Sequence, residues 1–458
     1  MKKTIIYHFI LAGFIAAMFT SCSEDELDLQ PLSAIGSNGF YTNTEEVEGA
    51  VIAIYDGLQQ VPLREFALFE MRTDNTESNT GEGVWGEFND FDVLPTNLAV
   101  GEYWAANYNV IFRANKVLEN LEVVTDAAAK AQFEGEALFA RALAHFNLVQ
   151  GYGDVPYVDK VIIQTDTDYF DRDPASTVLT NVISDLTRAV GLLLSKGDTE
   201  FGRATNSAAE AVLAKVYLTT GDYGTAEVLF GNIINSGEYS LQTSYADVFY
   251  NEGNDEIIFA IPYVNDDVNE SQDFSFEMTI GGRNTGLNFA TTDFLTSMDP
   301  EDIERAPILI NPATTAESGK FVTSSSDARL CGNDWIVMRY ADVLMMYAEA
   351  IMAGNGSTQD LDALGAYNMI RERVGLSTLP LDGSATLDDV TLLDERRMEL
   401  AFENHRLNDL KRFGKAESVL GAFAARNSLS FTATDLILPI PQGEINVSSG
   451  LLTQNPGY

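Results

Sequence analysis

The sequence predicts a mainly α-helical protein in which paired helices support two irregular, loop-rich segments with a few short strands. Apolar residues recur at the helical spacing i, i+3, i+4 through most of the chain. A helical pair of 34 residues occurs twice, at 206–239 and 340–373. Two long segments, 72–100 and 262–335, lack this spacing and are rich in Asn, Asp, Thr and Gly. Long irregular segments in compact proteins are often functional, so we expect the binding surface there.

The N-terminus carries an export signal. Lys2 and Lys3 precede an apolar run at 5–19, which is too short to span a membrane as a helix. A positive start followed by a short apolar run and small residues is typical of a secretory signal peptide. We therefore assign residues 1–21 to a signal peptide that is removed on export.

The residues after the signal resemble a lipid attachment site. The sequence FTSC at 19–22 is similar to a bacterial lipobox, which implies cleavage before Cys22 and lipidation of that cysteine. An acidic run at 23–26 resembles the surface-export signal of Bacteroidetes lipoproteins. Residues 22–40 are then a lipidated tether, and 41–458 form the folded domain. The alternatives are an ordinary signal peptide with an incidental cysteine and a solvated acidic linker.

Charge and cysteine content exclude two classes of protein. The chain has 68 acidic and 28 basic residues and a formal net charge of −40. Without a cluster of Lys and Arg, such a polyanion does not bind nucleic acid. The two cysteines, Cys22 and Cys331, exclude a disulfide framework. We expect Cys331 to be an inert thiol, buried or in a loop.

Helices are predicted in order along the chain. Thr44 can cap a first helix that starts near residue 45. Helical spacing resumes at 102–124, 127–151 and 175–195. The units 206–239 and 340–373 match the period of a tetratricopeptide repeat, and the pair of helices within 127–195 is a looser copy. Such hairpins bury their apolar faces only by stacking on neighbours, so the repeats should form one curved layer.

The remaining segments do not follow this repeat of paired helices. Residues 256–261 form an apolar run that predicts a buried strand, and a charge-rich helical stretch follows at 391–413. Residues 436–441 contain too much proline for a central strand. We expect that last segment to lie extended across the helical core.

Several motifs occur in a fixed order: EALFARALA at 136–144, GYGDVP at 151–156, RYADVL at 339–344 with YAEA at 347–350, DERRMELAFE at 394–403 with HR at 405–406 and DLKR at 409–412, LPIP at 438–441, and NPGY at 455–458. Together they resemble the SusD/RagB family of outer-membrane lipoproteins over nearly the whole mature chain. The resemblance implies a SusD-like fold of helical hairpins under a variable, loop-rich face. It also implies a partner, a SusC-like TonB-dependent transporter, which receives a ligand that is usually a glycan.

The charged residues of these motifs lie on helices at spacings that favour ion networks over catalysis. We predict such buried or interfacial networks for Arg141, Asp342, Glu349, Glu395, Arg396, Arg397, Glu403 and Arg406.

Ligand contacts in this family come from the early loop and from the excursion before the RYAD helix. The resemblance therefore favours a site made by Arg72, Asp74, Trp85, Arg283 and Phe289. Sugars offer apolar faces and hydroxyl rims, which suit a flat aromatic ring beside polar side chains. The alternative for Trp85 is that it only plugs the loop onto the scaffold.

The other two tryptophans, Trp104 and Trp335, are expected in the core, since one lies on a helix and the other directly precedes one. The loops contain more Asn, Asp and Thr than Trp, which leaves a peptide ligand open as an alternative to a glycan. A tetratricopeptide scaffold for protein partners alone is another alternative.

Catalysis finds little support in the sequence. His145 falls on an apolar helical ladder and His405 in the charged helical stretch, and no H-E-x-x-H, G-x-S-x-G or P-loop spacing occurs. We therefore predict no enzyme, with a surface glycan hydrolase as the rival hypothesis because carboxylates are abundant.

No cofactor is predicted, although a structural calcium ion stays open as an alternative. Asp166, Asp168 and Asp171 form a short acidic cluster. A calcium loop needs a Glu at its twelfth position, where Thr177 stands, so we interpret the cluster as a solvated loop.

Overall fold

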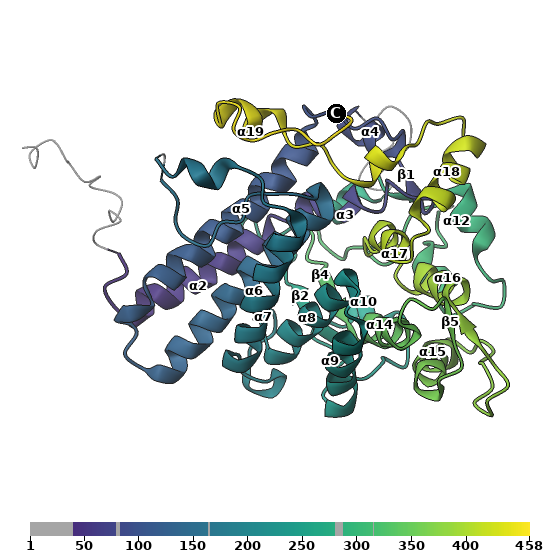
Figure 1. The fold of residues 1–458 in the computed structure, drawn as a ribbon. Helices are drawn as coiled ribbons and strands as arrows, with labels where there is room; N and C mark the ends of the chain where they lie inside the picture. The colour runs from purple at the N-terminus through teal and green to yellow at the C-terminus, as the bar shows by residue number, and fades with distance from the viewer. Residues whose placement is uncertain (1–39, 79–82, 164, 280–286, 315) are drawn as a thin grey trace, which may run out of the picture.

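The computed structural model describes residues 40–78, 83–163, 165–279, 287–314 and 316–458. The predicted signal peptide, Cys22 and nearly all of the tether lie outside these residues. The main scaffold is a row of helices, each packed on the next (Figure 1). In order, the row consists of α2 (Thr44–Gln59), α5 (Leu98–Glu119), α6 (Ala127–Tyr152), α7 (Ala175–Leu192), α8 (Asn206–Thr220), α9 (Tyr223–Ser236), α14 (Tyr340–Met352) and α15 (Leu361–Arg373).

The predicted hairpins are confirmed as α6–α7, α8–α9 and α14–α15. The turn between α8 and α9 shows how local residues set this geometry. Gly221 ends α8 in the left-handed region at φ 82°, where glycine carries no steric penalty. The side chain of Asp222 then caps α9 by accepting a hydrogen bond from the Thr225 amide.

The cap of the first helix differs by one residue from the prediction. Asn43, not Thr44, is the capping residue of α2, and its side chain accepts a hydrogen bond from the Glu46 amide at 3.0 Å. Asn43 has the extended backbone conformation that a capping side chain requires, whereas Thr44 is already helical.

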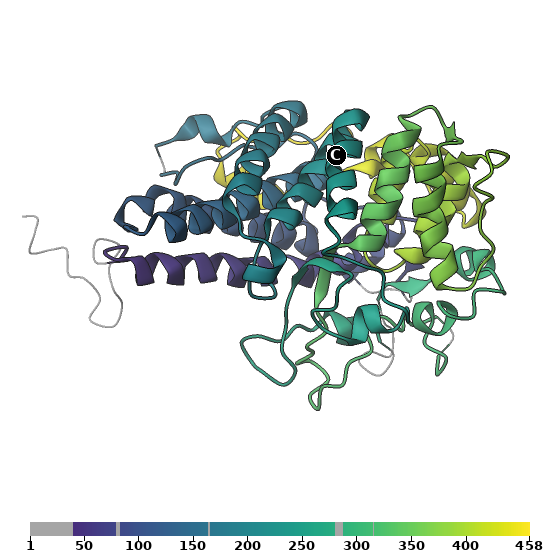
Figure 2. The same ribbon diagram turned by 90° about the horizontal axis from the view of Figure 1, so that it is seen from below.

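The irregular excursion lies on one side of the helical layer, as the view from below shows (Figure 2). Its predicted strand is confirmed as β2 (Ile257–Ile261), which pairs antiparallel with β4 (Trp335–Arg339). Between these strands the described elements are short: α11 (Phe274–Glu277), β3 (Phe289–Ala290), α12 (Thr292–Ser297) and α13 (Ala306–Leu309).

The charged stretch at 391–413 forms two helices, α16 (Asp389–Glu399) and α17 (Arg406–Arg412). Between them, Phe402 and Asn404 have positive φ values of 66° and 68°, which L residues seldom adopt. Contacts with an earlier segment hold this turn. The Phe402 amide donates to the Glu70 carboxylate, and the Asn404 side-chain oxygen accepts from the Phe69 amide.

The C-terminal segment contains α18 (Ala416–Arg426), the 3₁₀ turn η7 (Ala433–Leu436) and α19 (Gln442–Val447). The expectation that residues 436–441 lie extended on the core is confirmed, because the Leu438 amide donates to the Gly151 carbonyl at 2.7 Å. Asn455 joins the same place, with its amide group donating to the carbonyls of Tyr152 and Leu438, each at 2.8 Å. Three of the motifs named above therefore meet at the end of α6.

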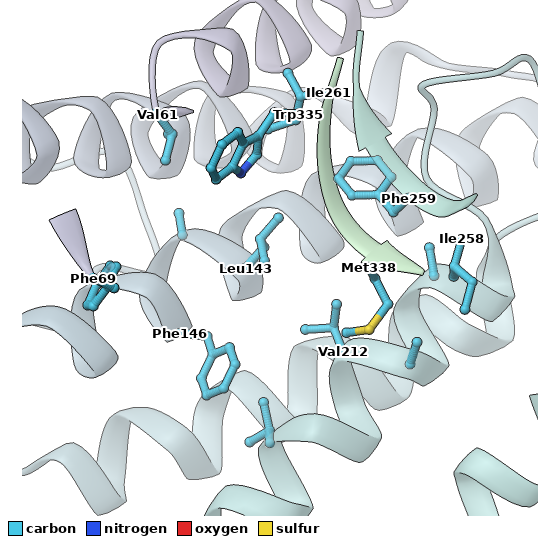
Figure 3. Packing of buried hydrophobic residues seen from close by; sticks show 14 of the residues in the cluster. Val61, Phe69, Leu143, Phe146, Val212, Ile258, Phe259, Ile261, Trp335 and Met338 are labelled. Carbon is cyan, nitrogen blue, oxygen red and sulfur yellow. The ribbon is translucent and has the colours of Figure 1, made fainter. Parts of the chain in front are cut away.

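One large apolar cluster lies between the helices and the β2–β4 pair (Figure 3). Trp335, Phe259 and Met338 project into it from the strands, and Phe146 and Val212 from the helices. Trp104 and Trp335 are only 4% and 3% exposed, which confirms that both belong to the core. His145 is fully buried, and Cys331 is buried as a free thiol.

The predicted ion networks are confirmed in the buried part of the fold. Arg339 reaches the carboxylates of Glu256, Glu399 and Glu403 at 2.8, 2.6 and 2.7 Å. Arg396 binds Asp409 and Asp342, both at 2.8 Å. These side chains satisfy one another inside the scaffold, so they are not available to a ligand.

Apart from residues 76–89, which belong to the candidate site, the other described elements are short connections: α3 (Pro62–Leu68), η4 (Leu121–Val123), η5 (Thr167–Phe170), η6 (Lys196–Asp198), α10 (Asp247–Tyr250), β5 (Ser357–Thr358) and β6 (Leu387–Asp388). Strands β5 and β6 pair antiparallel. No helix in the described part of the chain is both long and apolar enough to cross a membrane.

Candidate ligand-binding face

The two irregular segments meet through a short antiparallel strand pair. Strand β1 (Thr76–Glu77) pairs with β3, so that Thr76 faces Ala290 and Glu77 faces Phe289. The Thr291 amide adds a hydrogen bond to the Asn75 carbonyl at 2.9 Å. Segments that are far apart in sequence therefore form one face, as expected for a site made from both.

Arg72 and Asp74 lie beneath this face. They are only 2% and 4% exposed. One amino group of Arg72 donates to the backbone carbonyl of Asp435 at 2.5 Å. The expectation that these two residues contact a ligand does not fit this burial, and we reassign both to support of the face.

The carboxylate of Asp74 forms ion pairs with Arg406 at 2.9 Å and with Arg397 at 3.0 Å. Burial raises the pKa of Asp74, but the two guanidinium groups outweigh burial and hold the pKa below its usual value. The charged side chain therefore links the early loop to helices α16 and α17.

Trp85 ends a 3₁₀ turn, η3 (Gly83–Trp85), and leads directly into α4 (Gly86–Asn89). Its ring lies 5.1 Å from that of Phe66 and 5.5 Å from that of Phe88, measured between centroids. Both phenylalanines are buried, whereas Trp85 is half-buried. Trp85 is thus fixed from below and open on the other side, and its contact with a ligand stays a prediction.

The remaining two predicted residues differ in status. Phe289 is 8% exposed, so most of its ring is covered by the fold. Arg283 lies outside the described residues. Four of the five predicted residues are described by the structure, and among these four only Trp85 has an appreciably exposed side chain.

Sequence reasoning missed a cleft of about 910 Å³ that begins where α4 ends. We call it the C-terminal cleft. Its walls are residues 90–95 on one side and residues from 428–435 with Gly457 and Tyr458 on the other. A volume in this range suits a ligand of several rings. The closing NPGY motif carries two of its residues, Gly457 and Tyr458, and nothing in the motif itself indicates a cleft.

Aromatic packing and hydrogen bonds build the walls of the cleft. Phe91 packs edge-on against Phe431, with centroids 5.1 Å apart. The Tyr458 hydroxyl donates to the Ile437 carbonyl at 2.8 Å. Gly457 has φ 99°, and a Cβ placed there would come within 2.5 Å of the Thr434 side chain. Only glycine therefore allows the chain end to approach this wall.

The Asp435 carboxylate holds the turn at 432–435 by accepting hydrogen bonds from the Thr432 amide and hydroxyl at 2.7 and 3.1 Å. Arg72, which donates to the Asp435 carbonyl, supports the same wall from behind. Within the described ranges, no group of three His, Cys, Asp or Glu side chains lies close enough together to hold a metal ion.

Comparison with known proteins places the chain in a family. Residues 27–218 match a family described as "Starch-binding associating with outer membrane", and residues 304–458 match the SusD family. The chain belongs to the SusD/RagB family. A SusD-like protein of Formosa agariphila is 28% identical over 97% of this chain and 99% of its own length. A SusD-like protein of Bacteroides ovatus is 26% identical over 86% of this chain and 80% of its own.

Solved structures of SusD-like proteins share the fold. A laminarin-binding SusD-like protein superposes with a TM-score of 0.76 at 25% identity, covering 91% of this chain and all of the other. Surface glycan-binding protein A of Bacteroides thetaiotaomicron, in complex with laminarihexaose, has a TM-score of 0.75 at 22% identity and covers 90% of this chain and all of the other. The mainly helical SusD-like fold expected from the sequence is confirmed.

Proposed function

We propose that this SusD-like chain binds an oligosaccharide at the cell surface and delivers it to a SusC-like TonB-dependent transporter. The observation that carries the proposal is the half-buried ring of Trp85, fixed by Phe66 and Phe88 one short helix away from the C-terminal cleft. A fixed aromatic surface stacks on sugar rings at little entropic cost, and the neighbouring polar groups suit sugar hydroxyls.

The names of similar proteins support a glycan as the ligand class. One solved relative is named for laminarin binding, and another was solved with laminarihexaose. We extend the ligand class, not the individual glycan, to this chain. Attachment to the outer membrane through a lipid on Cys22, with the face toward the exterior, belongs to the same proposal.

We propose binding without catalysis. Burial lowers the pKa of His145 to about 3 and that of His405 to about 4, so both rings are neutral inside the scaffold. His145 is fixed between the Arg141 carbonyl and the Val158 amide. Neither histidine is placed to act as a general base at the face.

The proposal is tested by affinity electrophoresis and calorimetry of the mature chain with a panel of polysaccharides and peptides. Trp85→Ala is expected to weaken glycan binding at least about tenfold, because stacking on an aromatic ring is lost, while the melting temperature changes little. Phe112→Ala is the matched control, because Phe112 is an aromatic residue on α5 that is 47% exposed.

Three results would contradict this proposal. Binding of peptides but of no glycan would favour the RagB-like alternative. Release of reducing ends, abolished by a single Asp or Glu substitution, would favour a hydrolase. A large loss of stability in Trp85→Ala with unaltered affinity would show that Trp85 only plugs the loop.

A further inference from the structure

The C-terminal cleft begins five residues after the aromatic residue of the proposed site along the chain, and Trp85 itself does not line it. Helix α4 carries the chain from Trp85 to Asp90, which is about 7.5 Å along a helix that rises 1.5 Å per residue. At low salt, where the Debye length is about 30 Å, charges in the cleft therefore act on a ligand stacked on Trp85 even where that ligand does not enter the cleft. The charge of the cleft then acts on the ligand as a whole.

Three carboxylates give the cleft its charge. Asp90, Asp92 and Asp435 line it, and none of them forms an ion pair with another described residue. Asp90 and Asp92 are exposed. This contrasts with the carboxylates inside the scaffold, such as Asp74, which are paired with arginines.

Positive charge is scarce on this surface. Among the residues that the structure describes, no Lys, Arg or His lines the cleft. Arg72 lies behind the wall at 2% exposure and donates to the Asp435 backbone. The three carboxylates that line the cleft are therefore not offset by a basic side chain among its described lining residues. The chain as a whole, at −40, reinforces this sign.

The uncharged polar side chains of the cleft carry hydroxyl groups. Ser428, Ser430 and Thr432 are exposed along one wall. Carboxylates and hydroxyls accept hydrogen bonds from the O–H groups of a neutral sugar, and those to a carboxylate are the stronger ones. A carboxylate or a sulfate group on a sugar takes the place of such an O–H donor and adds a negative charge beside the three carboxylates. The anionic sugar is therefore repelled.

We infer that the C-terminal cleft makes this protein selective for uncharged glycans and excludes glycans that carry uronate or sulfate groups. The inference rests on the proposed function and adds the chemical class of the ligand to it. The selectivity comes from the long-range repulsion of the cleft carboxylates and not from a shaped contact with one sugar.

The first test compares neutral and anionic glycans on the full mature chain. A panel of neutral glucans, mannans, xylans and galactans is run beside polyuronates and sulfated galactans. The tightest neutral oligosaccharide is then compared with its own C6-carboxylated derivative by calorimetry. We expect the derivative to bind at least about tenfold more weakly at 0.01 M salt, where the Debye length is about 30 Å, and the difference to narrow at 1 M, where it is about 3 Å.

The second test uses charge-neutralising variants. The combined variant Asp90→Asn, Asp92→Asn, Asp435→Asn should bind the neutral oligosaccharide and its carboxylated derivative within about threefold of each other at 0.01 M salt, since the repulsion is removed. The matched control, Glu45→Gln, Glu48→Gln, Glu227→Gln, changes the net charge equally at exposed positions on α2 and α9 and should keep the full discrimination. Should loss of the Asp435 turn unfold the triple variant, Asp90→Asn with Asp92→Asn should still reduce the discrimination.

The outcomes separate this inference from the proposed function. Equal or tighter binding of an anionic glycan by the native chain overturns the inference and leaves glycan binding intact. Unchanged discrimination in the cleft variants, or equal loss of discrimination in the control, also overturns it. If no glycan of either kind binds, the proposed function fails and the inference fails with it.

Discussion

The carboxylate of Asp74 accepts two hydrogen bonds from the guanidinium of Arg406, at 2.9 and 3.0 Å, across a separation of 332 residues. Arg397 donates to the Asp74 carbonyl at 2.9 Å and to the Asn75 side chain at 2.6 Å. These bonds fix the two residues that precede β1 on helices α16 and α17. The ligand-binding face therefore rests on a buried ion network that itself binds no ligand.

Substitution of Asp74 should reduce stability. Asp74→Asn leaves Arg406 and Arg397 buried without their shared anion, and breaking a buried pair in this way costs about 3 kcal/mol or more. Urea unfolding followed by circular dichroism measures the change. Asp92→Asn is the control, because Asp92 is exposed and its loss should shift the free energy of unfolding by less than about 0.5 kcal/mol. Equal effects of the two substitutions would show that the network does not stabilise the face.

The buried histidine predicts a pH dependence of stability. Burial lowers the folded-state pKa of His145 to about 3, whereas an unfolded histidine titrates near about 6.5. Below the unfolded pKa the unfolded chain takes up a proton that the folded chain does not. This histidine therefore makes stability fall as pH drops from about 6.5 toward about 3, by up to about 1.4 kcal/mol per pH unit.

His145→Gln should cost stability at pH 8 but flatten the profile between about pH 6.5 and about pH 4 by the slope of one proton. Urea unfolding across this range measures both effects. A native-like slope in the variant would mean that His145 is already protonated in the folded protein.

Two glycine substitutions should change the free energy of unfolding in opposite directions. Gly457→Ala places a Cβ within 2.5 Å of Thr434 at a φ of 99°, so we expect a loss of about 1–3 kcal/mol and a disturbed cleft wall. Gly443→Ala lies in α19 with nothing within 4 Å of the added Cβ, and should stabilise by about 0.4–1 kcal/mol. Thermal unfolding of both variants shows whether each substitution raises or lowers stability. Neutral behaviour of Gly457→Ala would contradict the close approach of the chain end to Thr434.

Sequence reasoning predicted the helical scaffold well because its signals are local. The spacing of apolar residues and the Gly221–Asp222 turn determine α8 and α9 without reference to the rest of the chain. The same spacing placed His145 in the core, and the positions of Trp104 and Trp335 in or before helices placed them there too.

The candidate site could be predicted only in part, because its partners are distant in sequence. Arg72 and Asp74 stand in a polar segment, and such residues are usually exposed. Their burial depends on Asp435 and Arg406, which are 363 and 332 residues away. The C-terminal cleft likewise joins residues 90–95 to residues from 428–435 and to Gly457 and Tyr458, and no local pattern relates these segments.

Tryptophan fluorescence tests the central claim, that a glycan binds on the face at Trp85, most directly. The chain has three tryptophans, and Trp104 and Trp335 are buried at 4% and 3% exposure, so a ligand on this face alters the emission of Trp85. Titration with the tightest neutral oligosaccharide should give a saturable change in emission, which Trp85→Phe should abolish. Tight binding by calorimetry with no change in emission, and with the same affinity in Trp85→Ala, would contradict the claim.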